Sequence, residues 1–326
     1  MKLILLLATV IAATQGLSVE EHWAAFKENY GKTYTSYEHE KRRFDIFQEN
    51  LLLIQQHNSR YEKGETAYYM GITKFSDITD EEFNAMFSKI PKTKNGKINI
   101  LQTSTTSAPL PDSVDWKAAG VLPPVVDQGD CLAGYAFSSA DAFSALLFIK
   151  HNESVQLSAQ ELIDCTREYG NGGCRGGEAF ASFLYVEEKG LRTASAYPFT
   201  GKNDACNATA ASTESAVKMA EYERIISLDT AVQYYLATRG PVNADIYANP
   251  LIRHYKGGIY DDAERCPNEI SLLNHGVLIV GYGTTNGTDY WFVKNSWGTK
   301  WGEEGYFKLK RSICGITMNG HVANIA

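Results

Sequence analysis

The 326-residue sequence lacks several features that would assign it at once to a structural class. No internal repeat is evident, so the pattern of a repeat protein is absent. After the apolar run from Leu3 to Ala13, no stretch is long and apolar enough to span a bilayer. The net charge of −7 is modest and scattered, which excludes the basic patterning expected for a nucleic-acid or anionic-membrane partner. We therefore expect a soluble globular protein with one or two sizeable cores.

Cysteine is absent from the first 130 residues, and the later cysteines include no C-x₂-C pair. The lack of such a pair argues against a zinc site, and we expect neither a metal nor a cofactor. An even number of cysteines in an oxidising compartment predicts three disulfides and no free thiol. Spacing alone does not choose among the fifteen pairings that six cysteines permit. The six are Cys131, Cys165, Cys174, Cys206, Cys266 and Cys314.

The oxidising compartment is inferred from the first 16 residues. MKLILLLATVIAATQG has one positive charge, a short apolar run and small residues before Leu17, which predicts a secretory signal peptide over residues 1–16. Three Asn-x-Ser/Thr sequons, at Asn152, Asn207 and Asn286, are consistent with glycosylation along that route. We expect delivery outside the cell, including a digestive lumen, or to a lysosome.

Residues 18–90 are expected to be helical. Ser18-x-x-Glu21 and Thr79-x-x-Glu82 are capping boxes, each in front of an apolar helical pattern. Between them, apolar residues recur three or four positions apart, as on one helix face: Phe44, Phe47, Leu51 and Ile54.

Residues 92–113 are rich in Lys, Thr, Ser and Pro without sustained periodicity, and they predict an exposed linker open to proteolysis. This order predicts a pro-segment over residues 17–107 and a mature domain over 108–326.

The mature domain divides again. Residues 133–190 are expected to be helix-rich, with a buried stripe, a cap at Ser158-x-x-Glu161 and a helix that ends at Gly190. Residues 215–326 contain strand patterns instead, such as GVLIVGYG, YWFVKNSWG and GYFKLKR. The fold class is therefore α+β.

Two strand-associated segments carry polar residues that an apolar core would not favour, namely Asn274-His275 and Asn295, with Trp297 close behind. Taken singly, such a His is more often a hydrogen-bonded structural residue, and such an Asn often makes a turn. Together with Gln128, which precedes a predicted helix at Gly134, they fit a Cys-His-Asn site. That chemistry needs a thiol at a helix N-terminus, a His to move the proton, an amide to orient the His, and donors for an oxyanion.

The sequence resembles the papain-like cysteine peptidases of the cathepsin L type over nearly its whole length. The pro-segment matches at Arg43-x₃-Phe47-x₂-Asn50-x₃-Ile54-x₃-Asn58 and at Gly71-x-Thr73-x-Phe75-x-Asp77, although His39 stands where the family has Glu. The mature part matches at SVDW, DQG-x-C, YAFS, Cys174-x-Gly176-Gly177, NHGVLIVGYG and NSWG.

The resemblance implies a helical left domain and a β-barrel-like right domain with a cleft between them, preceded by a helical inhibitory pro-segment. It also implies the disulfides Cys131–Cys174, Cys165–Cys206 and Cys266–Cys314.

The sequence departs from the family at the nucleophile. Where the family has Gln-Gly-x-Cys-Gly-Ser-Cys-Trp, this chain has Gln128-Gly-Asp-Cys131-Leu-Ala-Gly134-Tyr135, so the first cysteine is present and the reactive one is replaced by Gly134. The even cysteine count agrees, because active relatives carry one additional free thiol. Leu132, Ala133 and Tyr135 also differ from the family, which favours natural loss over a single engineered change.

No other residue is an obvious substitute. Cys131 is expected in a disulfide, and Ser138 lies one helical turn further on, about 6 Å along the axis. His275 could activate a water instead. Because loss of the nucleophile in a serine-type site costs about 10⁶ in kcat, we expect no useful turnover.

The residues of the cleft that bind peptide in the family are expected to keep that role here. Gly176 and Gly177 resemble the edge along which the family pairs with an extended peptide, and glycine permits close approach. By resemblance, the main specificity pocket is lined or adjoined by Glu178, Ala179, Asp245, Asn274, Gly276 and Asn319. Asp245 would make it acidic and favour a basic or polar side chain, unless Asp245 faces solvent. Without a thiolate, His275 is expected to titrate near about 6.5.

Three functions remain open. The first is an inactive homologue whose cleft binds peptides, proteins or cystatin-like inhibitors, besides its own pro-segment. The second is a hydrolase with non-standard chemistry. The third is a structural or storage protein with a vestigial cleft, since His, Asn and Trp also pack the domain interface. A monomer is expected.

Overall fold

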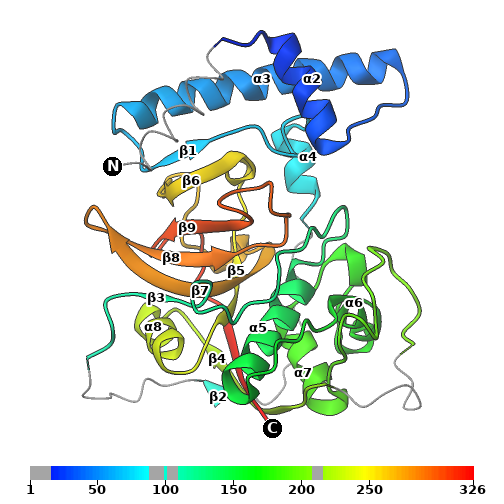
Figure 1. The fold of residues 1–326 in the computed structure, drawn as a ribbon, viewed down its shortest axis with the longest axis vertical. Helices are drawn as coiled ribbons and strands as arrows, with labels where there is room; N and C mark the ends of the chain where they lie inside the picture. Colours follow the sequence, from blue (N-terminus) through cyan, green and yellow to red (C-terminus); the bar gives the residue numbers. More distant parts are fainter. Residues whose placement is uncertain (1–15, 88–98, 101–108, 208–215) are drawn as a thin grey trace.

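The computed structural model describes residues 16–87, 99–100, 109–207 and 216–326. The predicted signal peptide, apart from its last residue, and most of the predicted linker lie outside these ranges. Within the described residues, no helix combines the length and the apolar character needed to cross a membrane. The pro-segment forms one end of the molecule, and the body divides into a helical half and a strand half (Figure 1).

The pro-segment is built from the helices α2 (Val19–Tyr30), α3 (Tyr37–Glu62) and α4 (Asp80–Ala85). Both predicted capping boxes are present, at Ser18 and at Thr79, because in each the hydroxyl and the Glu side chain satisfy one another's backbone N–H groups. Of the predicted stripe on α3, three members are buried and Phe44 packs against them at the edge.

The expectation that residues 18–90 are helical holds for α2, α3 and α4 and is wrong for the segments between them, one of which forms a strand. Residues Tyr68–Met70 form a strand, β1, which pairs antiparallel with β6 (Tyr255–Tyr260) of the body. The alternation of buried Tyr68 and Met70 fits a strand, and the pairing satisfies backbone groups that would otherwise be unpaired. The pro-segment is therefore joined to the body by a sheet.

The helical half of the body contains α5 (Gly134–His151), α6 (Ala159–Cys165) and α7 (Ala179–Lys189), with the short 3₁₀ turns η1 (Arg167–Tyr169) and η2 (Gly173–Arg175). Every residue of α5 from its start to Leu147 is buried, so this helix is the centre of the body and not a surface helix. Gly190 ends α7 as predicted, and Ser158 caps α6. The N-terminus of α5 faces the strand half.

The strand half is a twisted ten-stranded sheet in the order β1-β6-β9-β8-β7-β5-β10-β4-β2, with β3 paired to β7. Besides β1 and β6, its strands are β2 (Asn99–Ile100), β3 (Val114–Asp115), β4 (Met219–Ile225), β5 (Val242–Ile246), β7 (His275–Thr285), β8 (Thr288–Lys294), β9 (Tyr306–Lys310) and β10 (Gly320–Ile325). The helix α8 (Asp229–Thr238) and the turns η3 (Pro250–His254) and η4 (Ile270–Leu272) interrupt the strand pattern, and the sequence patterns did not predict them.

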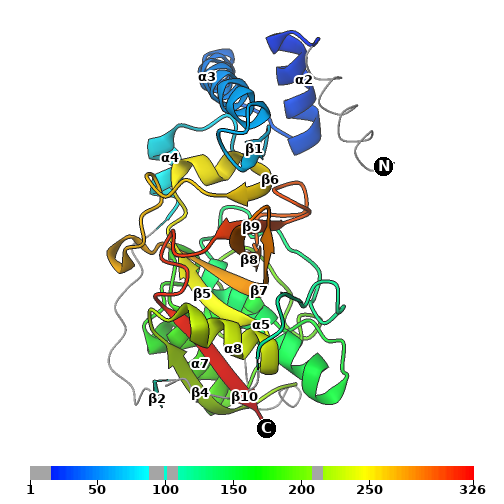
Figure 2. The ribbon, with the colours of Figure 1, turned by 90° about the vertical axis from the view of Figure 1, so that its left-hand side faces the viewer.

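Both outer strands of this sheet come from the segment that precedes the predicted mature domain. The strand β1 lies beyond β6, and β2, which falls in the predicted linker, pairs parallel with β4. Seen from the side, the pro-segment helices lie above β6 while β2 lies at the opposite end of the molecule (Figure 2). The linker is therefore not wholly without regular structure.

Three disulfides connect the cysteines, Cys131 with Cys174, Cys165 with Cys206, and Cys266 with Cys314, and none of the described cysteines is free. These are the three pairs that the resemblance implies. The asparagines of the three sequons, Asn152, Asn207 and Asn286, are all exposed.

Candidate active site

The imidazole of His275 is held between two neighbouring strands. His275 is the first residue of β7, and Asn295 follows directly after the adjacent strand β8. Nε2 of His275 lies 2.8 Å from Oδ1 of Asn295, which also accepts the backbone N–H of Ser296. Because the amide oxygen accepts, Nε2 carries the proton and Nδ1 is left as the free ring nitrogen of the neutral imidazole. The indole of Trp297 stacks on the ring at 4.9 Å.

Gly134 is the first residue of α5 and faces the imidazole. A Cβ atom built on Gly134 would lie 2.6 Å from both Nδ1 and Cε1 of His275, and 2.9 Å from the carbonyl oxygen of Gly276. The ring therefore fills the space in which a side chain at this position would begin. The helix start has no side-chain cap, so the first N–H groups of α5 point out of its end towards the site.

The Gln128 side chain stands beside the same helix start. Its Oε1 accepts the hydroxyl of Ser296 at 2.6 Å, and its Nε2 donates to the carbonyl oxygen of Cys131 at 2.7 Å. An amide nitrogen carries two hydrogens, so the bond to Cys131 leaves one for a ligand. The predicted oxyanion donors, Gln128 and the Gly134 backbone, both line one cavity.

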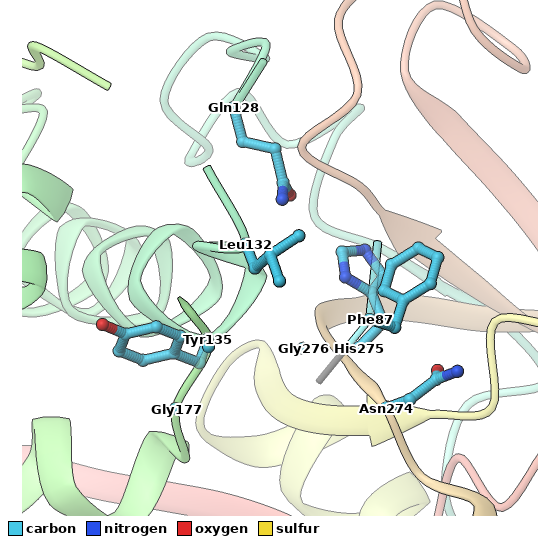
Figure 3. A pocket seen from close by; sticks show the side chains of 10 residues that line it. Phe87, Gln128, Leu132, Tyr135, Gly177, Asn274, His275 and Gly276 are labelled. Carbon is cyan, nitrogen blue, oxygen red and sulfur yellow. The ribbon is translucent and has the colours of Figure 1, made fainter. Parts of the chain in front are cut away.

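Leu132 and Tyr135, the neighbours that differ from the family pattern, point in opposite directions (Figure 3). Leu132 extends into the cavity between Gln128 and His275. Tyr135 turns away and donates its hydroxyl to the carbonyl of Gly173 at 3.3 Å. Its ring packs beneath Gly177, where an added Cβ would lie 2.9 Å from the Tyr135 ring, so Tyr135 supports the glycine edge.

Seven of the predicted site residues line the cavity together with Phe87, Leu132 and Tyr135. They are Gln128, Gly134, Gly176, Gly177, Asn274, His275 and Gly276. The Asn274 side chain also accepts the backbone N–H of Ala248 at 2.8 Å, which fixes the turn after β5. The remaining predicted residues are not among those that line the cavity, and they are Glu178, Ala179, Asp245, Asn295, Trp297 and Asn319.

Asp245 does not face solvent. It lies on β5 opposite Gly276 of β7, and it is fully buried. Its Oδ2 accepts the Asn319 amide at 2.5 Å, and Asn319 in turn accepts from the Arg224 guanidinium. Its Oδ1 has no partner among the described residues. Burial raises the pKa of Asp245 to about 7, so the carboxyl is only partly ionised at neutral pH, contrary to a simply acidic pocket.

Phe87 of the pro-segment covers the site. Its ring meets the His275 ring edge to face at 5.6 Å and also touches Trp297. The cavity that remains has a volume of about 20 Å³, enough for about one water molecule. The pKa of His275 is lowered to about 4, chiefly by burial, with the hydrogen bond to Asn295 acting against the shift and the positive charge of Lys74 adding to it. The expectation of a pKa near 6.5 is therefore wrong for the covered chain.

Neither substitute nucleophile reaches His275. Cys131 is bonded to Cys174. Ser138 is buried inside α5, where its hydroxyl donates to the Tyr135 carbonyl and accepts the Asn243 amide. A water in the cavity is the remaining attacking group that the geometry allows.

Sequence reasoning missed the residues that hold the pro-segment over the site. Arg253, at the turn η3, is buried and binds Asp80 at 2.6 Å and the Asn50 amide oxygen at 3.0 Å. The Arg253 carbonyl accepts the Thr73 hydroxyl, and Lys74 forms an ion pair with Asp127. No local pattern around Arg253 distinguishes it from a surface arginine, because its partners lie far away in the sequence. The sequence did contain an indication of Phe87, because it is an aromatic residue at the end of an apolar helical pattern.

Comparison with known families accounts for both parts of the chain. The family described as "Papain family cysteine protease" matches residues 110–324, and the family described as "Cathepsin propeptide inhibitor domain (I29)" matches residues 23–83.

Individual relatives agree. A cathepsin L-like proteinase of Phaedon cochleariae is 41% identical over 97% of each chain, and digestive cysteine proteinase 3 of Homarus americanus is 36% identical over 90% of this chain and 91% of that one. Among solved structures, digestive procathepsin L 3 of the Tenebrio molitor larval midgut superposes with a TM-score of 0.86 at 35% identity. The superposition covers 94% of this chain and 99% of the Tenebrio molitor chain.

Proposed function

Because the chain belongs to the papain family of cysteine peptidases, with a cathepsin L-like body and a propeptide inhibitor domain, we propose that it is an inactive member whose cleft binds peptide or protein segments. The observation that carries the proposal is Gly134, which places no side chain opposite His275 at the helix start where a papain-like site needs its thiol. The remaining parts, Gln128, His275 and Asn295, form a hydrogen-bonded frame without an attacking atom.

The glycine edge fits the proposed binding, and the packing of Asn171 against Gly177 also gives glycine a structural role there. Gly176 and Gly177 line the cavity, and at Gly177 a Cβ would collide with Asn171 at 2.5 Å. The edge therefore stays free of side chains, as close approach by an extended peptide requires. The partners we propose are peptides or protein segments, cystatin-like inhibitors and the chain's own pro-segment. Asp245, which lies opposite Gly276 on the neighbouring strand and has one unpartnered oxygen, supports a preference for a basic side chain.

The sequence features at the N-terminus, the linker and the sequons support a proposal for how the protein is processed and delivered. We propose cleavage after residue 16, a pro-segment ending at residue 107, and glycosylation at the three exposed sequons. Digestive relatives among the matched proteins support delivery to a digestive lumen, with a lysosome as the alternative.

The proposal is tested on protein cleaved in the linker by an added peptidase and freed of its pro-segment. Wild type and Gly134→Cys are compared on a fluorogenic dipeptide and in peptide and cystatin binding. We expect binding without turnover from the wild type. Turnover by the wild type would support non-standard hydrolysis, in which His275 activates a water. Absence of both binding and turnover would support a structural role.

A further inference from the structure

The helix start at Gly134 presents unused hydrogen-bond donors to a nearly closed cavity. The α5 helix has no N-cap side chain, and the Gly134 N–H is the first of its donors. The end of an 18-residue helix carries partial positive charge, which favours an anion. In the chain as it stands, no side chain of the described residues supplies that anion, since Gly134 has none and Leu132 is apolar.

A second, independent group points at the same place. His275 is only 4% exposed, and its hydrogen bond to Asn295 uses Nε2 alone. Nδ1 lies against Gly134 and has no hydrogen-bond partner among the described residues. A proton on Nδ1 would turn it into a charged donor, converging with the Gly134 N–H and the second hydrogen of the Gln128 amide.

We propose that this site binds the C-terminal carboxylate of a peptide, with His275 as the imidazolium, the Gly134 backbone and Gln128 as the three donors. The partial positive charge of the helix end and the full positive charge of the imidazolium both favour a negatively charged ligand, and a carboxylate is such a ligand. The inference rests on the proposed peptide-binding function and names the part of the peptide that the centre of the cleft recognises.

A chain end fits this place better than a continuous chain. The Leu132 side chain stands in the cavity between Gln128 and His275 and narrows it, so a chain that continues through the donors needs room on both sides of Leu132, whereas a chain that ends at them needs room on one side only (Figure 3). The space for the carboxylate is the space that Phe87 now covers, because the Phe87 ring lies on His275. Binding therefore requires Phe87 to leave.

The charges around His275 determine the pH at which the preference for a C-terminal carboxylate should be largest. The groups packed against the ring are Phe87, Asn295 and Trp297, none of which titrates, and the charged group that acts on it is Lys74. Both Phe87 and Lys74 belong to the predicted pro-segment, so a peptide that displaces them removes the positive charge of Lys74, which disfavours the imidazolium, and puts a carboxylate beside the ring in place of Phe87. The preference for a carboxylate should then be strongest at pH 5 and weaker at pH 8.

The test uses the full chain cut in its linker, with the pro-segment still present as a competitor. The probe is a pool of random pentapeptides with a fluorophore at the N-terminus, synthesised once with a free carboxylate and once with a C-terminal amide. Binding is followed by fluorescence anisotropy at pH 5. We expect the carboxylate pool to bind at least tenfold more tightly, and His275→Gln, but not the exposed-site control His151→Gln, to reduce that ratio to about twofold or less.

Two outcomes would overturn the inference and are distinguishable. Equal affinity of the two pools would refute the carboxylate site and leave peptide binding intact. No binding of either pool at millimolar concentration, both with the pro-segment present and after its removal, would refute peptide binding itself. If His275→Gln does not fold, the comparison of the two pools on the wild type still decides.

Discussion

The imidazole of His275 lies where a side chain on residue 134 would begin, 2.6 Å from the position of a Cβ atom. Adding that atom must move the ring or the helix start, and such overpacking costs about 1–3 kcal/mol. We therefore expect Gly134→Ala to lower the free energy of unfolding by roughly that amount, measured by urea denaturation. In a His275→Ala background the cost should fall, because the two closest contacts are with the ring and only the 2.9 Å contact with the Gly276 carbonyl remains. An unchanged cost in the double variant would place the strain elsewhere.

Restoring the thiol alone should restore little activity. Gly134→Cys returns the nucleophile, but Leu132 still fills part of the cavity and Tyr135 still holds the glycine edge in its present form. We expect the triple variant Leu132→Gly, Gly134→Cys, Tyr135→Trp to exceed Gly134→Cys by at least tenfold in kcat/KM on a fluorogenic dipeptide. Equal activities would show that the nucleophile was the single loss.

The pro-segment should be released more easily in acid. The pKa of His275 is about 4 when covered, against about 6.5 for an ordinary histidine, so the covered state takes up the proton less readily. The affinity of the pro-segment is therefore complete above pH 6.5 and falls as the pH drops towards 4, by about tenfold per pH unit.

This slope is measured on the chain cut in its linker, by the dissociation of the pro-segment at each pH. His275→Gln should flatten it. His321→Gln should not, since the depressed pKa of His321, about 3, comes from burial within the body beside Tyr222. A slope that survives His275→Gln would assign the effect to another group.

The buried Arg253 should contribute much of the affinity of the body for the pro-segment. Asp80→Asn removes the carboxylate that pairs with Arg253 and leaves a buried guanidinium without its counter-charge. Because Asp80 itself is half exposed, we expect a loss of about 1–3 kcal/mol in pro-segment affinity and not the larger cost of a fully buried pair. The neighbouring change Glu81→Gln should have little effect. Equal effects of the two would indicate general charge and not this pair.

Asp245 should set the side-chain preference of the cleft. Its unpartnered Oδ1 can accept from a lysine or arginine side chain, and the charge on that ligand would favour the ionised carboxylate. On chain cut in its linker, we expect basic peptides to bind more tightly than leucine-containing ones above pH 7, and Asp245→Ala to abolish the difference. Glu153→Ala, at an exposed site beyond α5, is the control. A strict preference for Phe would contradict the prediction.

Local features of the fold were predictable from sequence because their causes are local. The capping boxes at Ser18 and Thr79 depend on residues three apart, and the burial of α3 follows from its apolar spacing. The strand β1 was missed because its partner β6 lies almost two hundred residues away, so no short window contains the reason for it.

The same contrast between local and long-range causes holds at the candidate active site. The approach of Gln128, His275 and Gly134 followed from the resemblance, and the structure places all three around one cavity. The pKa of His275 did not follow, because it depends on burial of the ring and on Lys74, which belongs to a different segment and comes near the ring only in the folded chain. Asp245 was placed near the pocket, but its burial and its contact with Asn319 required the packing of three strands.

The two outer strands of the sheet, β1 and β2, both precede the mature domain in the chain. An unpaired strand edge offers a row of backbone donors and acceptors to any other chain, and proteins protect such edges against aggregation. Removal of the pro-segment would expose β6 at one end and β4 at the other in a single step. The segment that closes the cleft is thus also the cover for both ends of the sheet, and these two strand edges stay paired for as long as the segment stays in place.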